Sequence, residues 1–476
     1  MNPLFKIIPL ILFHFCFNTE LLAQKYGNNW CFGDSLMLNF NSCVPVVSSS
    51  SNEGFEGCST ISDSLGNLLF YTNSVKVWNK NHNLMQNGIL MNTVGTISQV
   101  LIIPKPLSIK DYYVFTVQVQ ASPFSPKFQY HEIDMNLNSG LGAVTNKNII
   151  IDTTAITEQI AATWHSNGVD IWVMVHEYGT SNFKAYLVTS TGISFSPIIS
   201  SIGSIHSSCF SNINARGNIK FSPDGTKLAF NANGWGANIA SNLLETFDFD
   251  NSTGIVSNQI KLPFLRGEFG LSFSPDNSKL YCTTWNASGN TIDSNYLYQF
   301  DLSSGDSNTI VNSRQVIHST TLSEVFGSIK IGPDGKIYVA RAFDNYIGVI
   351  NNPNQAGASC NYNHSGIDLN EKECQHGLNN YIEYTSYCNP VSILKEIRET
   401  NLIKILPNPY SNHFSIEGLN NPYDLNIYNA MGQLLYQENN IFEISKRVVA
   451  DCFSNGLLFI RIKSENEFFN YKLLKK

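Results

Sequence analysis

Charged side chains are scarce in this sequence of 476 residues. Only 14% of the residues are Asp, Glu, Lys or Arg, against about 25% in ordinary soluble domains. The 30 basic and 37 acidic residues give a net charge of −7, and the basic residues form no long run. Because a nucleic-acid interface needs clustered cations to replace the counterions of the phosphates, this composition excludes nucleic acid as a partner.

Long apolar runs are equally rare. The one run dominated by apolar residues, IIPLILFHFCF, covers residues 7–17, with Lys6 before it and Ala23 a few residues after it. This run is too short to cross the ~30 Å hydrocarbon core of a membrane, and its flanks match the regions of a secretory signal peptide. We therefore expect residues 1–23 to be a signal peptide and the mature protein to have no membrane span.

Cysteine pairs of the CxxC type are absent, although the sequence has 10 cysteines. Without such pairs there is no pattern for a structural zinc site, and the HExxH and GxSxG motifs are missing as well. The sequence therefore predicts no metal, no cofactor and no catalytic residue. Cysteines of an exported protein are expected to form disulfides. Cys360 and Cys374, which bracket a short loop, are the predicted pair.

Period-2 alternation of apolar residues is abundant, and it predicts an all-β chain. Tight turns recur along the chain at intervals of 45, 57, 57, 52 and 58 residues. They lie at Gly66, Asp111, Gly168, Gly225, Asn277 and Gly335. Units of about 50 residues with four short strands are typical of β-propeller blades. A single four-stranded sheet leaves both faces wet, and neighbouring sheets in a ring cover them.

Residues 24–390 are therefore predicted to form a β-propeller of seven blades, with six blades as the alternative. Six turns are visible, and the flanking residues 30–40 and 377–384 are expected to supply together the strands of a seventh blade that closes the ring. A β-sandwich is the competing fold, but it would show turns every 8–12 residues, without similar turn sequences that recur every ~50 residues.

Several segments, in this order, resemble the secreted β-propeller proteins of Bacteroidota that are described as gliding-motility-associated or WD-repeat-like. They are NNWCFGDSLMLNF, FSPDGTKLAF, FGLSFSPDNSKLY, GPDGKIYVA and CQHGLNN. The resemblance covers residues 30–381 and departs from the family pattern at Asn379, which replaces the proline of a Gly-Leu-Pro-Asn run. It implies a surface-exposed or secreted propeller and leaves the ligand open.

The C-terminal segment resembles the type A sorting domain of the type IX secretion system. The matching positions include Pro407, Asn408, Pro409, Gly432, Gly456 and Lys472. The family pattern Gly-(Ile/Leu)-Tyr is altered here, because Leu458 takes the place of the tyrosine. The alternating strands predict a small Ig-like β-sandwich over residues 402–476, after a polar linker at 391–401. The resemblance implies that the type IX secretion machinery is a partner of this domain.

Two side chains are candidate ligand contacts. His206 lies in the polar segment SIGSIHSSCF, and Trp235 lies in the glycine-rich segment NANGWGAN, where we expect the indole to be exposed. The spacing of His165 and His176 fits no metal motif, so these residues are expected to form hydrogen bonds between strands. The Asp residues of the SPDG, SPDN and GPDG turns are expected to accept backbone N–H groups of their own turns rather than to bind calcium.

These patterns together favour an exported, non-catalytic binding or adhesion module at the cell surface or in the medium. An extracellular glycan or protein is the expected ligand. One alternative is an extracellular propeller enzyme that acts on polysaccharide or peptide. The other is a structural component of a surface or motility apparatus. An enzyme would need acid, base or metal-binding residues from several blades that converge at the channel, whereas a binding module would need an exposed aromatic and amide patch.

Overall fold

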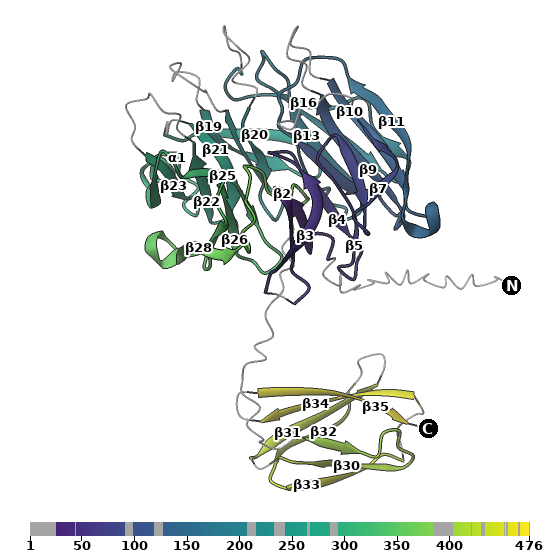
Figure 1. Cartoon of the computed structure of the whole chain (residues 1–476). Coiled ribbons are helices and arrows are strands. Elements are labelled where there is room, and N and C mark those ends of the chain that lie inside the picture. The colour runs from purple at the N-terminus through teal and green to yellow at the C-terminus, as the bar shows by residue number, and fades with distance from the viewer. Residues whose placement is uncertain are drawn as a thin grey trace, which may run out of the picture. The chain divides into compact units, whose positions relative to one another are not determined.

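The computed structural model describes most of the chain in two compact units, with a boundary after residue 390 (Figure 1). The described residues are 25–42, 44–90, 99–118, 127–206, 216–232, 243–263, 267–285, 294–383, 403–419, 421–429, 434–451, 453, 456–464 and 467–475. The predicted signal peptide lies outside these ranges. None of the helices in the described part of the chain is long and apolar enough to span a membrane.

The first unit consists of small antiparallel sheets, each built from strands that are consecutive in the sequence. The first sheet has three strands: β1 (Asn29–Phe32), β2 (Asp34–Asn39) and β3 (Val46–Glu53). The next group is β4 (Ser59–Ser62), β5 (Leu68–Thr72), β6 (Lys76–Asn79) and β7 (Leu84–Ile89). It is followed by β8 (Val100–Pro104), β9 (Asp111–Gln118), β10 (Lys127–Asp134) and β11 (Ala143–Asp152), and β11 also touches β7 in a short parallel pairing.

Four further sheets follow in the same way. The first has β12 (Ala161–Trp164), β13 (Ile171–His176), β14 (Asn182–Thr189), β15 (Gly192–Ile193) and β16 (Ile198–Ser201). The second has β17 (Ile219–Phe221), β18 (Lys227–Ala232), β19 (Leu243–Asp250) and β20 (Ile255–Lys261). The third has β21 (Glu268–Phe273), β22 (Lys279–Thr284), β23 (Ser294–Asp301) and β24 (Gln315–Thr321). The fourth has β25 (Val325–Ile331), β26 (Ile337–Ala342), β27 (Tyr346–Ile350) and β28 (Tyr362–Asp368). The helical segments among the described residues are η1 (Asn138–Gly140), α1 (Ser307–Asn312) and η4 (Gly357–Cys360).

A hydrophobic core lies between each sheet and the next. Phe70 of β5 and Val114 of β9 belong to one such core, and Phe183 of β14 and Phe230 of β18 belong to another. The series closes on itself, because β26 and β27 of the last sheet share a core with β1 and β2 of the first. Each fully buried large apolar side chain contributes about 1.5–3 kcal/mol. Since every sheet is covered by two neighbours, the first unit has a propeller-like architecture.

The tight turns after β17 and β21 repeat one hydrogen-bond pattern. The carboxylate of Asp224 accepts the backbone N–H of Thr226 at 3.0 Å, and Asp276 accepts the N–H of Ser278 at 3.0 Å. In each turn a serine hydroxyl two residues earlier donates to the same carboxylate. These aspartates are therefore occupied by their own turns, which confirms the structural role predicted from the sequence.

Residues 374–383 close the ring without forming a strand. Their backbone runs beside the start of β4, where Asn380 N donates to Cys58 O at 2.9 Å. Thr60 N donates to the side-chain oxygen of Asn379 at 2.6 Å, and Tyr381 Oη donates to Ile331 O at 2.6 Å. The predicted strand at 377–384 is absent from the described residues because side chains, rather than a regular backbone ladder, supply these bonds. The side-chain oxygen that accepts from Thr60 belongs to the asparagine that replaces the proline of the family pattern.

The predicted disulfide is wrong, because Cys360 and Cys374 are both free and buried. Cys360 lies in the core between the β21–β24 sheet and the β25–β28 sheet. Cys374 lies in the core between the β25–β28 sheet and the β1–β3 sheet. Because one sheet separates these two cores, the short sequence distance between the cysteines does not bring their sulfur atoms together.

The second unit is a β-sandwich. One sheet contains β29 (Lys404–Leu406), β30 (His413–Glu417) and β33 (Ser445–Val449). The other contains β32 (Leu434–Ile441), β31 (Tyr423–Asn429), β34 (Gly456–Ser464) and β35 (Glu467–Lys475). Apolar side chains from both sheets form one core. The buried Lys475 ammonium donates to the backbone oxygens of Ala450, Asp451 and Phe453, so the final strand is tied to the β33 sheet.

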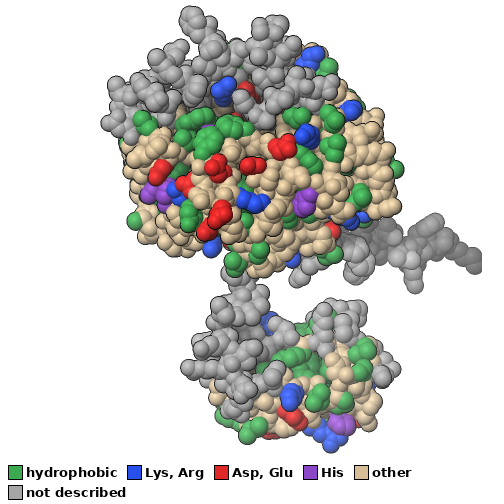
Figure 2. All heavy atoms as spheres, viewed as in Figure 1, with side chains coloured by type: hydrophobic (Ala, Val, Ile, Leu, Met, Phe, Trp, Pro, Cys, Tyr) green, Lys and Arg blue, Asp and Glu red, His purple; other side chains and the backbone are tan. Residues whose placement is uncertain are grey.

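The surface of both units has the character predicted from the composition. Figure 2 shows a surface dominated by uncharged side chains and backbone, with scattered Lys and Arg and one group of acidic side chains on the first unit. No extended basic patch is visible on this face, so charge does not identify a partner here.

Candidate functional site

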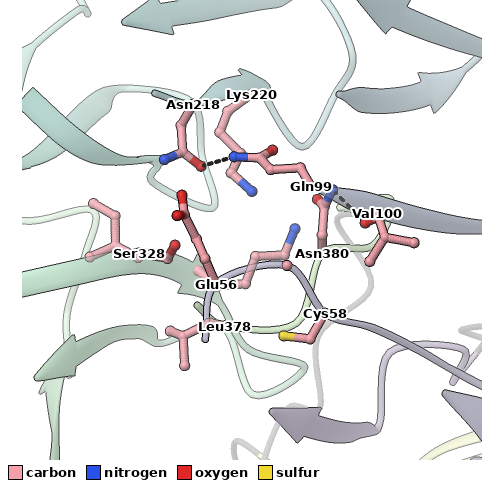
Figure 3. A pocket seen from close by; sticks show the side chains of 12 residues that line it. Glu56, Cys58, Gln99, Val100, Asn218, Lys220, Ser328, Leu378 and Asn380 are labelled. Carbon is pink, nitrogen blue, oxygen red and sulfur yellow. Dashed lines mark hydrogen bonds between the residues drawn. The ribbon is translucent and has the colours of Figure 1, made fainter. Parts of the chain in front are cut away.

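Polar side chains converge where the first strands of the sheets face one another. The pairs β1 and β4, β4 and β8, β12 and β17, β17 and β21, and β21 and β25 are all in contact, so these strands form the inner wall of the ring. A small cavity lies on this wall, near the points where the strands begin (Figure 3). It is lined by Glu56, Gly57, Cys58, Gln99, Val100, Asn218, Lys220, Ser328, Ile329, Lys330, Leu378 and Asn380. We call the space that this inner wall surrounds the channel. The end of the channel at which the inner strands begin is called the channel mouth.

The channel cavity is small. Its volume of about 20 Å³ is room for about one ordered water molecule. Amide groups fill much of the remaining space: Gln99 Nε2 donates to Asn218 Oδ1 at 3.3 Å, and Asn380 Nδ2 donates to the backbone oxygen of Val100 at 3.1 Å (Figure 3). A sugar or a peptide side chain therefore does not fit inside this cavity.

Two lysines lie within the channel. Lys330 is bound on several sides, because its Nζ lies 2.9 Å from Glu383 Oε1 and donates to Tyr381 O at 2.9 Å. The Lys330 ammonium also lies 4.2 Å from the centroid of the Tyr381 ring. Burial and the nearby positive charge of Lys330 lower the pKa of Lys220 to about 7. Burial also lowers the pKa of Lys330, against the opposing charge of Glu383. Lys220 therefore carries only a partial charge near neutral pH.

Two glutamates and an arginine form the second charged group of the channel. Burial, together with the charge of Glu158, raises the pKa of Glu56 to about 8, although Arg216 opposes this shift. Burial raises the pKa of Glu158 to about 7 against the same Arg216 charge. Near neutral pH these carboxyl groups are therefore protonated to a much larger extent than ordinary glutamates, and in that form they can donate hydrogen bonds.

A cluster of aromatic rings surrounds His376 at the channel mouth. The ring centroids of Phe55 and Trp285 lie 4.5 and 4.4 Å from the imidazole centroid, and those of Phe343 and Phe269 lie 5.2 and 6.0 Å away. The His376 side chain is fully buried, and neither ring nitrogen has a hydrogen-bond partner. Burial lowers the pKa of His376 to about 4, so the imidazole is neutral.

These rings come from segments that are far apart in the sequence and that meet at the channel mouth. Phe55 precedes β4, Trp285 follows β22, and Phe343 lies in the turn between β26 and β27. The pairing of Glu268 with Thr284 and of Val325 with Ala342 places the ends of β22 and β26 beside the starts of β21 and β25. His376 belongs to residues 374–383, which close the ring, and its backbone N–H donates to the backbone oxygen of Phe55 at 3.0 Å.

Phe343 differs from the other rings of the cluster in exposure and backbone. Its side chain is 54% exposed, and its φ of 64° lies in the left-handed region that bulky residues avoid. The turn is nevertheless fixed, because Phe343 N donates to Cys374 O at 2.7 Å and the flanking Arg341 and Asp344 form an ion pair. A strained backbone that presents an apolar ring to solvent is typical of a functional position.

The sequence-predicted contacts lie elsewhere. Trp235 is outside the described residues, so its exposure stays a prediction. His206 is buried, and its ring centroid lies 4.5 Å from that of His176 and 4.3 Å from that of Phe230. This placement favours a packing role, and ligand contact through His206 stays a prediction. His165 stacks on Trp172 at the opposite end of β13 from His176, so the two histidines form no joint site.

The described residues of the predicted sorting signal come from several elements of the second unit. Pro407, Asn408 and Pro409 follow β29, and the Asn408 side chain accepts the N–H of Leu474 at 3.1 Å. Gly456 opens β34 with a φ of 126°. Lys472 lies in β35, and Gly432 is outside the described residues. The function of these positions in sorting stays a prediction.

Metal binding has no support in the described part of the chain. Its His, Cys, Asp and Glu side chains form no group of three or more that could hold a metal ion. The carboxyl groups of Glu56, Glu158 and Glu383 face lysine and arginine partners in the channel instead.

Comparison with known proteins identifies the second unit. Residues 404–476 match the family described as a secretion system C-terminal sorting domain. This domain marks proteins that the type IX secretion system exports to the cell surface or into the medium, and the chain is such an exported protein. No curated protein matches the chain in sequence.

Several solved structures show a distant likeness to this chain. A functionally unknown protein from Desulfotomaculum acetoxidans DSM 771 is 12% identical over 75% of this chain and 99% of that chain, with a TM-score of 0.42. PorZ of Porphyromonas gingivalis, a surface component of the type IX secretion system, is 10% identical over 95% of this chain and 74% of that chain, with a TM-score of 0.33. The periplasmic gluconolactonase PpgL of Pseudomonas aeruginosa is 11% identical over 79% of this chain and 95% of that chain, with a TM-score of 0.36. At such scores these likenesses carry no argument about ligand or activity.

Proposed function

We propose that this chain is a non-catalytic binding module of the cell surface or the medium, which engages its ligand at the channel mouth. In this proposal the first unit is a seven-bladed propeller. Its seventh blade combines residues 374–383 with β1, β2 and β3. The second unit is an Ig-like sandwich that the type IX secretion machinery recognises during export.

The observation that carries this proposal is the contrast between the channel and its mouth. The cavity described in the channel has room for about one water molecule, which is too little space to surround a substrate with catalytic groups. The mouth instead presents the exposed Phe343 ring, which packs against Phe55 and His376, and Trp285 packs against the same His376. Apolar rings next to polar groups on a rigid scaffold support recognition of a surface rather than conversion of an enclosed substrate.

The binding proposal is tested with the purified full-length chain. It is immobilised and exposed to arrays of extracellular glycans and to protein extracts of the cell surface. Capture of a defined ligand that remains chemically unchanged on recovery is the expected result. A ligand that is recovered cleaved or rearranged overturns the non-catalytic part of the proposal.

The export partner is tested separately. Deletion of residues 402–476 is expected to keep the protein inside the cell, because the sorting domain is then missing. The chain is located by immunoblots of the medium, the intact cell surface and the cell lysate. Unchanged appearance outside the cell overturns the assignment of the type IX machinery as the partner.

A second candidate is an extracellular enzyme that acts on polysaccharide, and one observation favours it. The raised pKa values of Glu56, to about 8, and of Glu158, to about 7, keep a large fraction of these two carboxyl groups protonated near neutral pH. A protonated carboxyl group is suited to general acid catalysis. If this candidate holds, Glu56→Gln and Glu158→Gln each abolish turnover of the captured polysaccharide while binding persists.

A further inference from the structure

Two inner strands of the ring carry a lysine at the same position of the repeat. The segments IKFSPDG and IKIGPDG begin at Ile219 and Ile329, so Lys220 and Lys330 are the second residues of one shared pattern. Lys220 belongs to β17 and Lys330 to β25, and both line the small cavity in the channel. Their side chains are only 8% and 2% exposed. The repeat therefore brings two buried amino groups together inside the ring.

The two lysines differ in their partners. Lys330 Nζ lies 2.9 Å from Glu383 Oε1 and donates to Tyr381 O at 2.9 Å. Within the described part of the chain, no carboxylate oxygen lies within 4.0 Å of Lys220 Nζ, and the neighbouring charge of Lys330 opposes its protonation. Figure 3 shows the end of the Lys220 side chain directed into the cavity. A lysine buried in this way holds a full charge only where another group compensates it.

The other carboxyl groups of the channel do not compensate Lys220. Glu56 and Glu158 lie close enough for the charge of one to oppose ionisation of the other, and Arg216 is the cation that acts on both. Two neighbouring buried carboxyl groups resist ionising together, so the single Arg216 matches the charge that they develop near neutral pH. Among the described channel residues, Lys220 is therefore the cation that is left over.

The cavity limits what can compensate this cation. Its volume of about 20 Å³ holds a particle the size of one water molecule, so a carboxylate, sulfate or phosphate group is too large. The side-chain amide nitrogens of Asn218 and Asn380 already donate to backbone oxygens. The Lys220 amino group and the Ser328 hydroxyl group line the same space and can both donate to an occupant. These groups suit a small negative ion.

We infer that the channel binds a single monatomic anion of the size of chloride, held between Lys220 and Lys330. Lys330 is bound in turn to Tyr381 and Glu383 of residues 374–383, which close the ring. An anion at this point therefore connects β17, β25 and the closing residues, and it stabilises the closed propeller. This inference goes beyond the proposed function and involves none of the aromatic residues at the channel mouth.

The first test is thermal unfolding of the full-length chain in equal concentrations of sodium chloride and sodium gluconate. Gluconate has the same charge as chloride but is too large for the cavity. Chloride is expected to raise the midpoint by about 2–4 °C above that in gluconate, because an ion that binds only the folded chain stabilises it by mass action. Lys220→Met should abolish this difference. Lys227→Met is the matched control, because Lys227 lies in the same sheet with its side chain 37% exposed, and it should keep the difference.

The difference between the two salts should also depend on pH. The groups that face Lys220 are Lys330, Glu383 and Cys58, with Glu56 on the wall of the same cavity. The lowered pKa of Lys220, about 7, means that this residue is charged before the anion arrives only below that pH. Glu56, whose pKa is raised to about 8, gains negative charge as pH rises and repels an anion. The chloride effect should therefore be larger at about pH 6 than at about pH 8.5, and the opposite trend contradicts the inference.

The second test locates the anion directly. Crystals of the full-length chain are soaked in sodium bromide, which scatters X-rays anomalously, and a bromide peak beside Lys220 is the expected result. A cavity that holds water without an anomalous peak overturns the inference, and so does a chloride effect that persists in Lys220→Met. A bromide peak without any chloride effect in solution shows an adventitious ion only and also overturns it. If Lys220→Met does not fold, the bromide peak and the comparison of the two salts in the parent chain decide the question. Each of these failures leaves the proposed binding at the channel mouth intact.

Discussion

The first unit has two polar regions that differ in where the partners of their polar groups lie and in which residues have a positive φ. At the tight turns after the first strands, each aspartate is satisfied by neighbours two residues away, and the positive φ values fall on glycine or asparagine. In the channel and at its mouth, partners come from distant parts of the sequence, some polar atoms have none, and a phenylalanine occupies a positive φ.

This difference separates structure from function within one repeated fold. Turns that satisfy themselves need nothing from outside, so they repeat from sheet to sheet and support the architecture. A region with orphaned polar atoms and strained aromatics is maintained at a cost in stability, and such a cost is expected where a ligand binds. Substitutions of matched residues in the two regions test this contrast directly.

The largest difference is expected between two lysines. Lys330→Met leaves Glu383 buried without its cation, because their side chains are only 2% and 5% exposed, and we expect a loss of about 3–5 kcal/mol in the free energy of unfolding. Lys227→Met breaks the pair with Asp248 at the turn end, whose side chains are 37% and 45% exposed, and should cost about 0–1 kcal/mol. Urea denaturation of the full-length variants measures both.

The lysine comparison has an internal control. Adding Glu383→Gln to Lys330→Met removes the buried charge, so the double variant should recover part of the lost stability. Equal losses for Lys330→Met and Lys227→Met would show that the channel is no more dependent on distant partners than the turns are.

The second comparison concerns glycines at the turns. Gly168 and Gly225 both have a φ of 69°, but a Cβ on Gly168 meets nothing within 4 Å, whereas on Gly225 it comes within 2.5 Å of Thr163 Oγ1. We expect Gly168→Ala to cost about 1 kcal/mol from backbone strain alone. Gly225→Ala should cost about 2–3 kcal/mol, because the buried Thr163 must also move. Thermal unfolding of the two variants measures these losses. Equal losses of stability for Gly168→Ala and Gly225→Ala would show that the contact with Thr163 of the neighbouring sheet adds nothing to the cost.

The third comparison uses pH. The folded-state pKa of Glu56 is raised from 4.5 to about 8, so the folded protein binds more protons than the unfolded chain between these values, and the stability contributed by Glu56 is lost as pH rises. Glu56→Gln should therefore gain stability relative to the parent from pH 4.5 to 8, by about 1–2 kcal/mol because Glu56 is half-buried.

The matched carboxyl group at the turn end should behave in the opposite way. Burial would raise the pKa of Asp276, but hydrogen bonds from Ser274 and Ser278 lower it below the usual 3.8. The stability that Asp276 contributes is therefore present above pH 3.8 and is lost as pH falls through the lowered pKa. Asp276→Asn should be less stable than the parent at neutral pH, with a difference that shrinks in acid. Parallel pH profiles for the two variants would contradict the contrast between the regions.

The same contrast explains what the sequence could predict. The turns and the ~50-residue spacing are local features, so the repeats and the role of Asp224 and Asp276 could be derived from residue types alone. The aromatic cluster could not, because Phe55, Trp285, Phe343 and His376 share no motif or spacing and meet only when the ring closes. The predicted Cys360–Cys374 disulfide failed for the same reason, since proximity in sequence did not show that a sheet separates the two side chains.

The smallest change in stability is expected at the residue with the largest expected effect on binding. Phe343→Gly relieves the positive φ, which returns about 1 kcal/mol, and loses the half-buried ring, which costs a similar amount. The midpoint of thermal unfolding should therefore stay within about 4 °C of the parent, while ligand binding is lost. Phe343→Ala keeps the strain and should be the less stable of the two variants. If Phe343→Gly unfolds well below Phe343→Ala, the ring serves the closure of the propeller rather than a ligand, and the mouth then belongs with the turns as a structural region.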